Sequence, residues 1–96
     1  MKTKQIRYLK NTFKPGTRIE LIYMLDEPRM KPGLTGIVKH VDDIGQIHVS
    51  WSNGSYLALN CEVDQFIAYI GQTTIEFDGH FIEKLPDDHS GKTERK

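Results

Sequence analysis

The chain has 96 residues, a hydrophobic share of 38% and a formal net charge of zero at pH 7, which allows one domain with a single small core. No apolar run approaches the roughly 20 residues that a membrane span needs, and no apolar signal-peptide core follows the basic N-terminus. Cys61 is the single cysteine, so an internal disulfide is excluded and we expect a cytoplasmic protein.

The first segment, residues 1–14, is basic and holds no acidic residue. Its apolar residues Ile6, Leu9 and Phe13 are spaced three and four apart, which is typical of one face of a helix. A short helix that lies against the domain and a flexible basic arm are both compatible with this pattern. The Pro-Gly pair that follows ends the segment.

Two strands follow, separated by a long loop. Residues 17–23 alternate and include β-branched side chains, which is a strand pattern. Residues 24–33 hold two prolines and a glycine and are expected to form the loop. Residues 34–41 return to the strand pattern.

A hairpin is predicted with its turn at residues 42–45. In the register that pairs Val41 with Gln46, the bulky indole of Trp51 lies opposite Gly36, which has no side chain. A bulge in the turn would shift this register. The inner face then carries Val38, His40, Ile47, Val49 and Trp51, and the outer face carries Lys39, Gln46, His48 and Ser50.

The second half of the chain holds two more turn signals. Asn53-Gly54 supplies the positive φ angles of a two-residue hairpin turn, so residues 55–59 are expected to return as a third antiparallel strand. Residues 66–70 have the pattern of a closing strand. Residues 73–85 are predicted to form a second hairpin around Asp78-Gly79.

Short strands, tight turns and a long first loop indicate a mostly β fold. We expect a small, strongly bent SH3-like barrel of about five strands with an additional C-terminal hairpin. An OB-type barrel is the other candidate, although its strands are usually longer. We divide the chain into a flexible basic arm or short helix (residues 1–14), the barrel domain with its extra hairpin (residues 15–85) and a disordered tail without apolar side chains (residues 86–96).

Four sequence elements support a comparison with known families: Pro15-Gly16-Thr17-Arg18, Gly33 to Gly36, His40-Val41-Asp42-Asp43 and Trp51 to Gly54. From Phe13 to Phe66 the chain resembles a family of small proteins of phages and conjugative elements of Gram-positive bacteria, which carries only a domain-of-unknown-function label. The glycine–valine step and the following hairpin are also similar to the KOW-type SH3-like barrels of ribosomal and transcription proteins. The resemblance implies a barrel and a mobile-element setting, and it implies no catalytic residues.

The acidic, thiol and imidazole side chains do not form an enzyme or metal motif. Asp42 and Asp43 are adjacent in a turn, where aspartate bonds nearby backbone amides, so turn chemistry is favoured over metal or acid–base chemistry. Cys61 has no local cation or helix N-terminus that would activate it. The side chains that could act as soft-metal ligands lack the short spacing in the chain that is typical of zinc sites. This leaves open only a zinc site built from distant residues. These ligands are His40, His48, Cys61, His80 and His89.

Charge is unevenly distributed along the chain. Residues 1–41 hold nine basic and three acidic residues, and residues 42–96 hold four basic and ten acidic ones. The basic N-terminal segment could grip phosphates while its aromatic residues stack on bases, although a solvated arm that aids solubility fits equally well. Trp51 is favoured as a core residue over a surface aromatic platform. The candidate nucleic-acid-binding residues are Lys2, Lys4, Arg7, Lys10, Lys39, His48 and Trp51.

The acidic half supports a different hypothesis, which is protein binding. An acidic edge that bears aromatic side chains could mimic nucleic acid or dock on a basic protein surface. An ordinary hairpin whose aromatic residues close the core is the favoured alternative. The candidate protein-binding residues are Tyr69, Glu76, Phe77, Asp78, Phe81 and Glu83.

Our first functional hypothesis is a non-enzymatic binding protein of a mobile genetic element that engages a host or element protein of nucleic-acid metabolism. Its most specific form is an anti-CRISPR protein, an inhibitor of a CRISPR-type defence nuclease. The alternative is a KOW-like module that binds RNA or DNA through the basic N-terminal arm and the barrel face. We expect no cofactor and no membrane contact, and either a monomer or a homodimer paired through an exposed edge strand.

Overall fold

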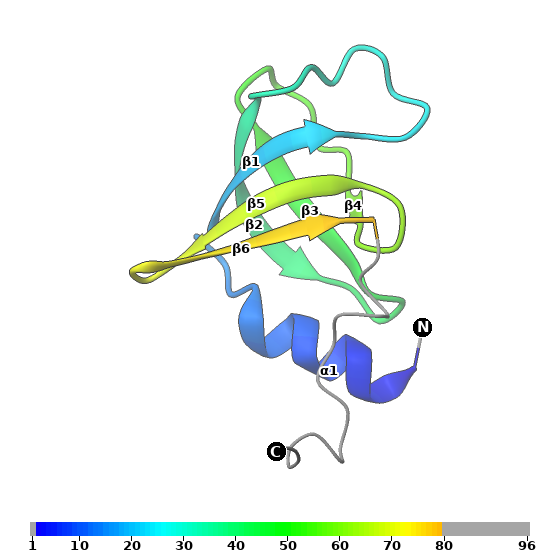
Figure 1. Cartoon of the computed structure of the whole chain (residues 1–96). Coiled ribbons are helices and arrows are strands. Elements are labelled where there is room, and N and C mark those ends of the chain that lie inside the picture. The colour runs from blue at the N-terminus through cyan, green and yellow to red at the C-terminus, as the bar shows by residue number, and fades with distance from the viewer. Residues whose placement is uncertain (1, 80–96) are drawn as a thin grey trace.

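The computed structural model describes residues 2–79, which form one helix and six strands (Figure 1). The predicted tail, residues 86–96, and the second arm of the hairpin predicted around Asp78-Gly79 lie outside the described residues. In chain order the elements are α1 (Thr3–Thr12), β1 (Arg18–Tyr23), β2 (Thr35–Val41), β3 (Gln46–Trp51), β4 (Leu59–Asn60), β5 (Gln65–Ile70) and β6 (Thr73–Asp78).

The strands form a single antiparallel sheet in the order β4-β3-β2-β1-β5-β6. Figure 1 shows that this sheet bends strongly, so that β1, β5 and β6 lie in front of β2, β3 and β4. The prediction of a mostly β fold is confirmed. Among the described residues the sheet is not closed into a barrel, because β4 and β6 are its two edges and do not pair with each other.

The turn of the β2–β3 hairpin is one residue shorter than predicted. Asp42 donates its backbone N–H to the carbonyl oxygen of Gln46 at 3.0 Å, which leaves a loop of three residues between them. The last loop residue, Gly45, has a φ of +87°, as a three-residue hairpin loop requires. The predicted pairing of Val41 with Gln46 is therefore wrong, and Val41 pairs with Ile47.

A bulge between Val38 and His40 compensates for the shorter turn, so the rest of the hairpin keeps the predicted register. Between the bulge and the turn, His40 pairs with His48. The prediction that these two histidines lie on opposite faces is wrong, because their rings stack on each other. Val41, and not His40, packs against the core.

The strands after Trp51 also differ in detail from the prediction. The backbone N–H of Trp51 donates to the carbonyl oxygen of Ser55 at 2.9 Å, so this turn holds three residues and not the predicted two. Strand pairing resumes only at β4. The predicted closing strand is β5, which lies between β1 and β6. β6 pairs with β5 across Gly71-Gln72, so this hairpin precedes the turn that we predicted at Asp78-Gly79.

The core lies inside the bend of the sheet, and Trp51 is part of it. The indole is 2% exposed and donates its Nε1 hydrogen to the carbonyl oxygen of Leu57 at 2.8 Å. Gly36 pairs with Trp51 as predicted. A Cβ atom on Gly36 would lie 2.5 Å from Cγ1 of Val49 and 2.9 Å from Cε3 of Trp51. The missing side chain therefore makes room for the indole.

The basic N-terminal segment forms a helix that packs on the sheet. Figure 1 shows α1 across one end of the bent sheet, where it lies against β2. Leu9 and Phe13 are almost fully buried, and the Phe13 ring lies 6.1 Å from the ring of Phe66 and 5.5 Å from that of Phe77. The three-and-four spacing therefore identified the buried face of the helix. Within residues 2–79, no helix has the length and apolar character to cross a membrane.

Candidate functional site

The exposed face of α1 carries a group of basic side chains. Lys2, Lys4, Arg7 and Lys10 are all exposed. Two of them stand at the start of the helix, whose first turn holds no acidic residue. The helix dipole favours negative charge at this end, so these lysines do not stabilise the helix electrostatically.

Lys10 has a structural contact. Its Nζ lies 2.6 Å from Oδ1 of Asp43, so the ion pair joins α1 to the β2–β3 turn. The Asp43 side chain is 96% exposed, and exposed ion pairs contribute at most about 1 kcal/mol to stability. Lys10 therefore helps to orient the helix. Lys39, another predicted binding residue, is exposed on β2.

His40 and His48 form a stacked pair on the outer face of the hairpin. Their ring centroids lie 4.3 Å apart with an angle of 8° between the planes, and His48 Nε2 is 2.7 Å from Oδ2 of Asp42. Oδ1 of Asp42 accepts the N–H groups of Ile44 at 3.1 Å and Gln46 at 2.9 Å. Burial raises the pKa of Asp42, but these hydrogen bonds lower it more, so the pKa lies below its ordinary value. Asp42 thus both closes the turn and orients His48.

The part of the chain that the structure describes contains no metal centre and no reactive thiol. No group of three or more His, Cys, Asp or Glu side chains among residues 2–79 could hold a metal ion. The lone pairs of an imidazole lie in its ring plane, so the parallel rings of His40 and His48 cannot share one metal in this arrangement. Burial raises the pKa of Cys61 to about 12, and the charge of Asp64 adds to this effect. A buried thiol that stays protonated is a poor nucleophile.

Arg18 and Glu20, which were not among the predicted site residues, lie beside the predicted residue Tyr69 on the outer face of the sheet. Arg18 pairs across the strands with Ile37 and with Tyr69, and its guanidinium carbon lies 4.7 Å from the centre of the Tyr69 ring. The Tyr69 hydroxyl donates to Oε1 of Glu20 at 2.8 Å, and this hydrogen bond raises the pKa of Tyr69. The alternation of residues 17–23 indicated that Arg18 and Glu20 share a face, but not which residues lie beside them.

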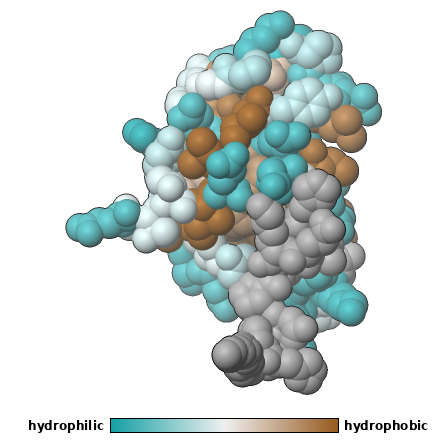
Figure 2. All heavy atoms as spheres, in the orientation of Figure 1, coloured by the Kyte–Doolittle hydropathy of each residue, from teal (hydrophilic) through white to brown (hydrophobic). Residues whose placement is uncertain are grey.

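Hydrophobic side chains also reach the surface near β1, β5 and β6. Figure 2 shows them gathered on the face where these strands lie, next to hydrophilic side chains. Tyr23, Leu25 and Val63 are each at least 40% exposed. They lie close together, because Leu25 donates its N–H to Asp64 at 3.0 Å and Tyr23 pairs with Gln65.

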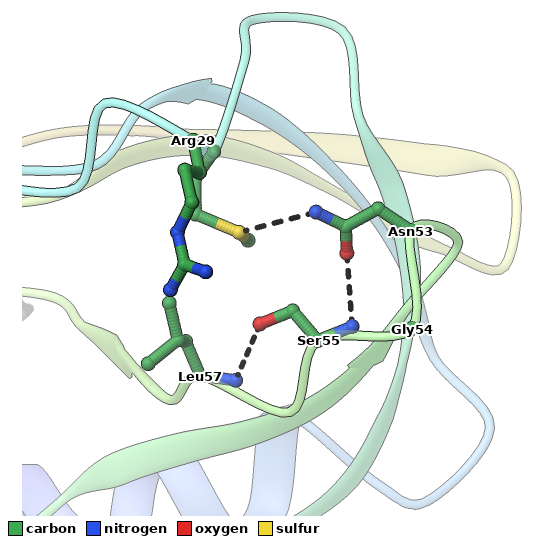
Figure 3. Close-up of a pocket in the computed structure, with 6 residues that line it drawn as sticks. Arg29, Asn53, Gly54, Ser55 and Leu57 are labelled. Carbon is green, nitrogen blue, oxygen red and sulfur yellow. Dashed lines mark hydrogen bonds between the residues drawn. The ribbon is translucent and has the colours of Figure 1, made fainter.

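A hollow of about 290 Å³ lies between the β1–β2 loop and the segment that follows β3 (Figure 3). The side chain of Arg29 extends towards Leu57 across this hollow. Asn53 donates to Sδ of Met30 at 3.7 Å and accepts the N–H of Ser55 at 3.0 Å, and the Ser55 hydroxyl accepts the N–H of Leu57 at 3.2 Å. Asn53 and Ser55 are therefore engaged in fixing the loop, and no residue predicted to bind a partner lines the hollow.

The predicted nucleic-acid-binding residues fall into two groups. The basic residues of α1 lie at the same end of the molecule as the β2–β3 turn, and Lys39 and His48 lie on the two strands that this turn joins. Trp51 is buried at the other end of β3, so its indole is not available to stack on a base.

The predicted protein-binding residues are divided between surface and core. Glu76 is exposed on β6, and Tyr69 lies on the outer face of β5. Phe77 is 6% exposed, and its ring stacks on the buried ring of Phe66 in β5 with the two ring centroids 4.8 Å apart. Asp78 is half-buried at the end of β6. The remaining two residues, Phe81 and Glu83, lie outside the described residues.

A known protein family matches most of the described part of the chain. The family model of DUF4314, a domain of unknown function, matches residues 2–69. The chain belongs to the DUF4314 family. The prediction of an uncharacterised domain family is thereby confirmed. The part that matches DUF4314 runs from α1 through β2 and β3 into β5, while β6 lies beyond it. No curated protein and no solved structure matches the chain.

Proposed function

We propose that this DUF4314 protein is a non-enzymatic module that binds RNA or DNA. The observation that supports the proposal is the exposed basic face of α1, with Lys2, Lys4 and Arg7 on a helix that is packed against the sheet. The buried side chain of Leu9 and the contact between Lys10 and the β2–β3 turn hold this helix in place. Cations on a fixed helix can bind phosphates without the entropy cost of ordering a flexible arm.

Further basic residues continue from α1 onto the sheet. All nine Lys and Arg among residues 2–79 lie in the first half of the chain. Lys14 and Arg18 follow the helix, and Lys39 lies on the neighbouring strand β2. The N–H of Gly16 donates to the carbonyl oxygen of Val38 at 2.9 Å, which keeps these two segments side by side. This arrangement supports contact with several phosphates of one strand.

The proposal includes an SH3-like fold class and a mobile-element setting. The strong bend of the sheet and the long loop between β1 and β2 support an SH3-like arrangement, similar to the KOW-type barrels of ribosomal and transcription proteins. In this view the protein acts on nucleic acid of a phage or conjugative element or of its host. A shared fold does not determine function, so the basic face of α1 remains the main support.

The direct test neutralises two charges on α1. Replacing Lys2 and Arg7 with Gln is expected to weaken binding of short labelled RNA and DNA. It should also reduce the slope of log K against log salt by roughly 1.5, because each lost phosphate contact contributes about 0.7 to 0.9. Fluorescence anisotropy at several salt concentrations measures both quantities. Lys10 is kept because it contacts Asp43.

A matched control removes the same charge elsewhere. Arg29→Gln with Lys31→Gln neutralises two exposed residues in the β1–β2 loop, at the end of the molecule opposite α1 (Figure 1). This variant is expected to keep the wild-type slope. Equal losses in both variants would mean that overall charge, and not α1, causes binding. The absence of binding to any nucleic acid at low salt would exclude the proposed function.

We propose protein docking as a second candidate function, with a basic protein of nucleic-acid metabolism as the partner. Residues 40–79 contain six acidic residues and no Lys or Arg. Glu76 is exposed on β6, which is an edge of the sheet within the described residues. An edge strand offers unpaired backbone groups to a partner. The most specific form of this candidate is inhibition of a CRISPR-type defence nuclease.

The nuclease form is tested with purified components. The protein is expected to reduce cleavage of target DNA by the nuclease, measured as the cleaved fraction on a gel. Glu76→Lys should weaken inhibition, because it places a like charge against the basic partner. Glu62→Lys makes the same charge change at the turn after β4 and serves as the control. Full cleavage at saturating protein would rule out inhibition of the nuclease tested.

A further inference from the structure

We propose that the outer face of the sheet around Arg18 and Tyr69 stacks on the bases of single-stranded nucleic acid. This face, called the stacking face below, consists of Arg18, Ile37, Tyr69 and the hollow beside them. The inference rests on the proposed nucleic-acid-binding function and names its substrate class as a single strand and not a duplex.

The first support is the fixed geometry of two flat side chains. Arg18 is exposed, and its guanidinium carbon lies 4.7 Å from the centre of the Tyr69 ring. The ring is held in turn, because its hydroxyl donates to Glu20 at 2.8 Å. All three residues lie on adjacent paired strands, β1 and β5. Guanidinium and aromatic planes are the groups on which unpaired bases commonly stack.

The second support is a shallow hollow of about 250 Å³ that adjoins Arg18. Pockets for drug-sized ligands have about 300–1,000 Å³, so this hollow suits a smaller flat group such as one base. Short side chains form much of its lining, and Ile37 supplies an apolar surface that is 43% exposed. The lining residues are Arg18, Thr35, Gly36, Ile37, Ser50, Trp51 and Ser52.

The third support is continuity with the basic face of α1. Val38 donates its N–H to the carbonyl oxygen of Thr17 at 2.8 Å, directly before Arg18. Lys14 and Lys39 lie on the two segments that this contact joins. A strand whose phosphates contact α1 can therefore continue past these lysines to Arg18, which offers both a positive charge and a planar surface.

The choice of a single strand follows from what the stacking face can reach. In a duplex the base faces are covered by neighbouring pairs, and only phosphates, sugars and groove edges are accessible. An unpaired base exposes its whole ring, and stacking on an aromatic side chain strengthens binding by at least about fivefold per base. Phosphate contacts alone would favour the higher charge density of the duplex.

The test compares oligonucleotides that differ in their bases and not in their phosphates. The probes are a labelled single-stranded DNA, the same length of abasic DNA, the corresponding RNA and a DNA duplex, measured by fluorescence anisotropy with the full chain. Wild-type protein is expected to bind the base-bearing single strand at least about fivefold more tightly than the abasic one. The DNA and RNA probes distinguish the two sources of a single strand.

Three substitutions locate the effect. Arg18→Lys keeps the charge but removes the planar guanidinium, so the preference for base-bearing DNA should fall to within about twofold while abasic binding is retained. Tyr69→Thr should do the same, whereas Tyr69→Phe keeps the ring and should keep most of the preference. Thermal unfolding of each variant verifies that the sheet is intact.

The outcomes separate this inference from the proposed function. If abasic, duplex and single-stranded DNA bind equally and the charge on α1 controls all three, the protein binds phosphates and the stacking face is excluded. If Arg18→Lys and Tyr69→Thr keep the full preference in a folded protein, the bases stack elsewhere and the inference is wrong. If no probe binds at low salt, the proposed function fails and the inference fails with it.

Discussion

At the scale of single residues, close packing at one glycine and hydrogen bonding at one carboxylate shape the fold. The position of Gly36 leaves no room for a Cβ, because Val49 and Trp51 occupy the space. Asp64 is 4% exposed, and its two oxygens accept the N–H groups of Leu25 at 3.0 Å and Asn60 at 2.8 Å. Asp64 thereby joins the β1–β2 loop to the turn after β4, and the hydrogen bonds compensate for the burial of its carboxylate.

The contact at Gly36 gives a prediction for stability. Gly36→Ala would place a Cβ 2.5 Å from Cγ1 of Val49, and the side chains would have to shift. We expect a loss of about 1–3 kcal/mol in the free energy of unfolding. Urea unfolding followed by the fluorescence of Trp51 measures the loss. The same substitution should cost less in a Val49→Ala background, because the two groups are in direct contact. An unchanged urea midpoint for Gly36→Ala would show that the core is looser than the structure indicates.

At the scale of elements, apolar burial attaches α1 to the sheet more strongly than its ion pair does. Leu9 is fully buried, and Phe13 packs in the aromatic cluster with rings from β5 and β6. The ion pair between Lys10 and Asp43 is exposed to solvent at both ends, since these side chains are 43% and 96% exposed. Salt and water weaken such a pair, while the buried side chains are shielded from both.

Two substitutions at adjacent positions separate these contributions. Leu9→Ala removes a buried side chain and is expected to cost about 2–5 kcal/mol in the free energy of unfolding. Lys10→Gln removes only the exposed ion pair and is expected to cost at most about 1 kcal/mol. Chemical unfolding followed by circular dichroism measures both. A larger loss for Lys10→Gln than for Leu9→Ala would mean that the ion pair, and not burial, holds the helix.

At the scale of the whole molecule, the order of strands brings residues that are distant in the chain together on one face of the sheet. Among residues 2–79 every Lys and Arg precedes β3, and the sheet order places β1 between β2 and β5. Arg18 is therefore flanked by Ile37 on one side and by Tyr69 on the other, although these residues are far apart in the chain. The net charge of zero conceals an uneven distribution, because residues 1–41 hold nine basic and three acidic residues. This uneven charge is one reason for proposing a polyanion as the partner.

Much of the local structure could be predicted from the residues alone. The alternation in β1, β2 and β3 and the glycines at the turns indicated the strands and hairpins, because side-chain direction and positive φ angles are local properties. The spacing of Leu9 and Phe13 likewise indicated which face of α1 is buried. Gly36 was correctly placed opposite Trp51, because this pair lies in the part of the hairpin that keeps the predicted register.

Only the tertiary structure decided which residues share a surface. The stacking of His40 on His48 depends on a three-residue loop and a bulge, and a shift of one residue moves a side chain to the other face. The pairing of β1 with β5, which brings Tyr69 to Arg18, is a contact between distant segments that no local pattern specifies. The sequence by itself thus determined most of the strands and the apolar face of the N-terminal segment, whose causes are local, but it left open whether that segment is a helix and placed the strand after β3 too early. The candidate binding surface depends on long-range packing, which arises only when the whole sheet has formed.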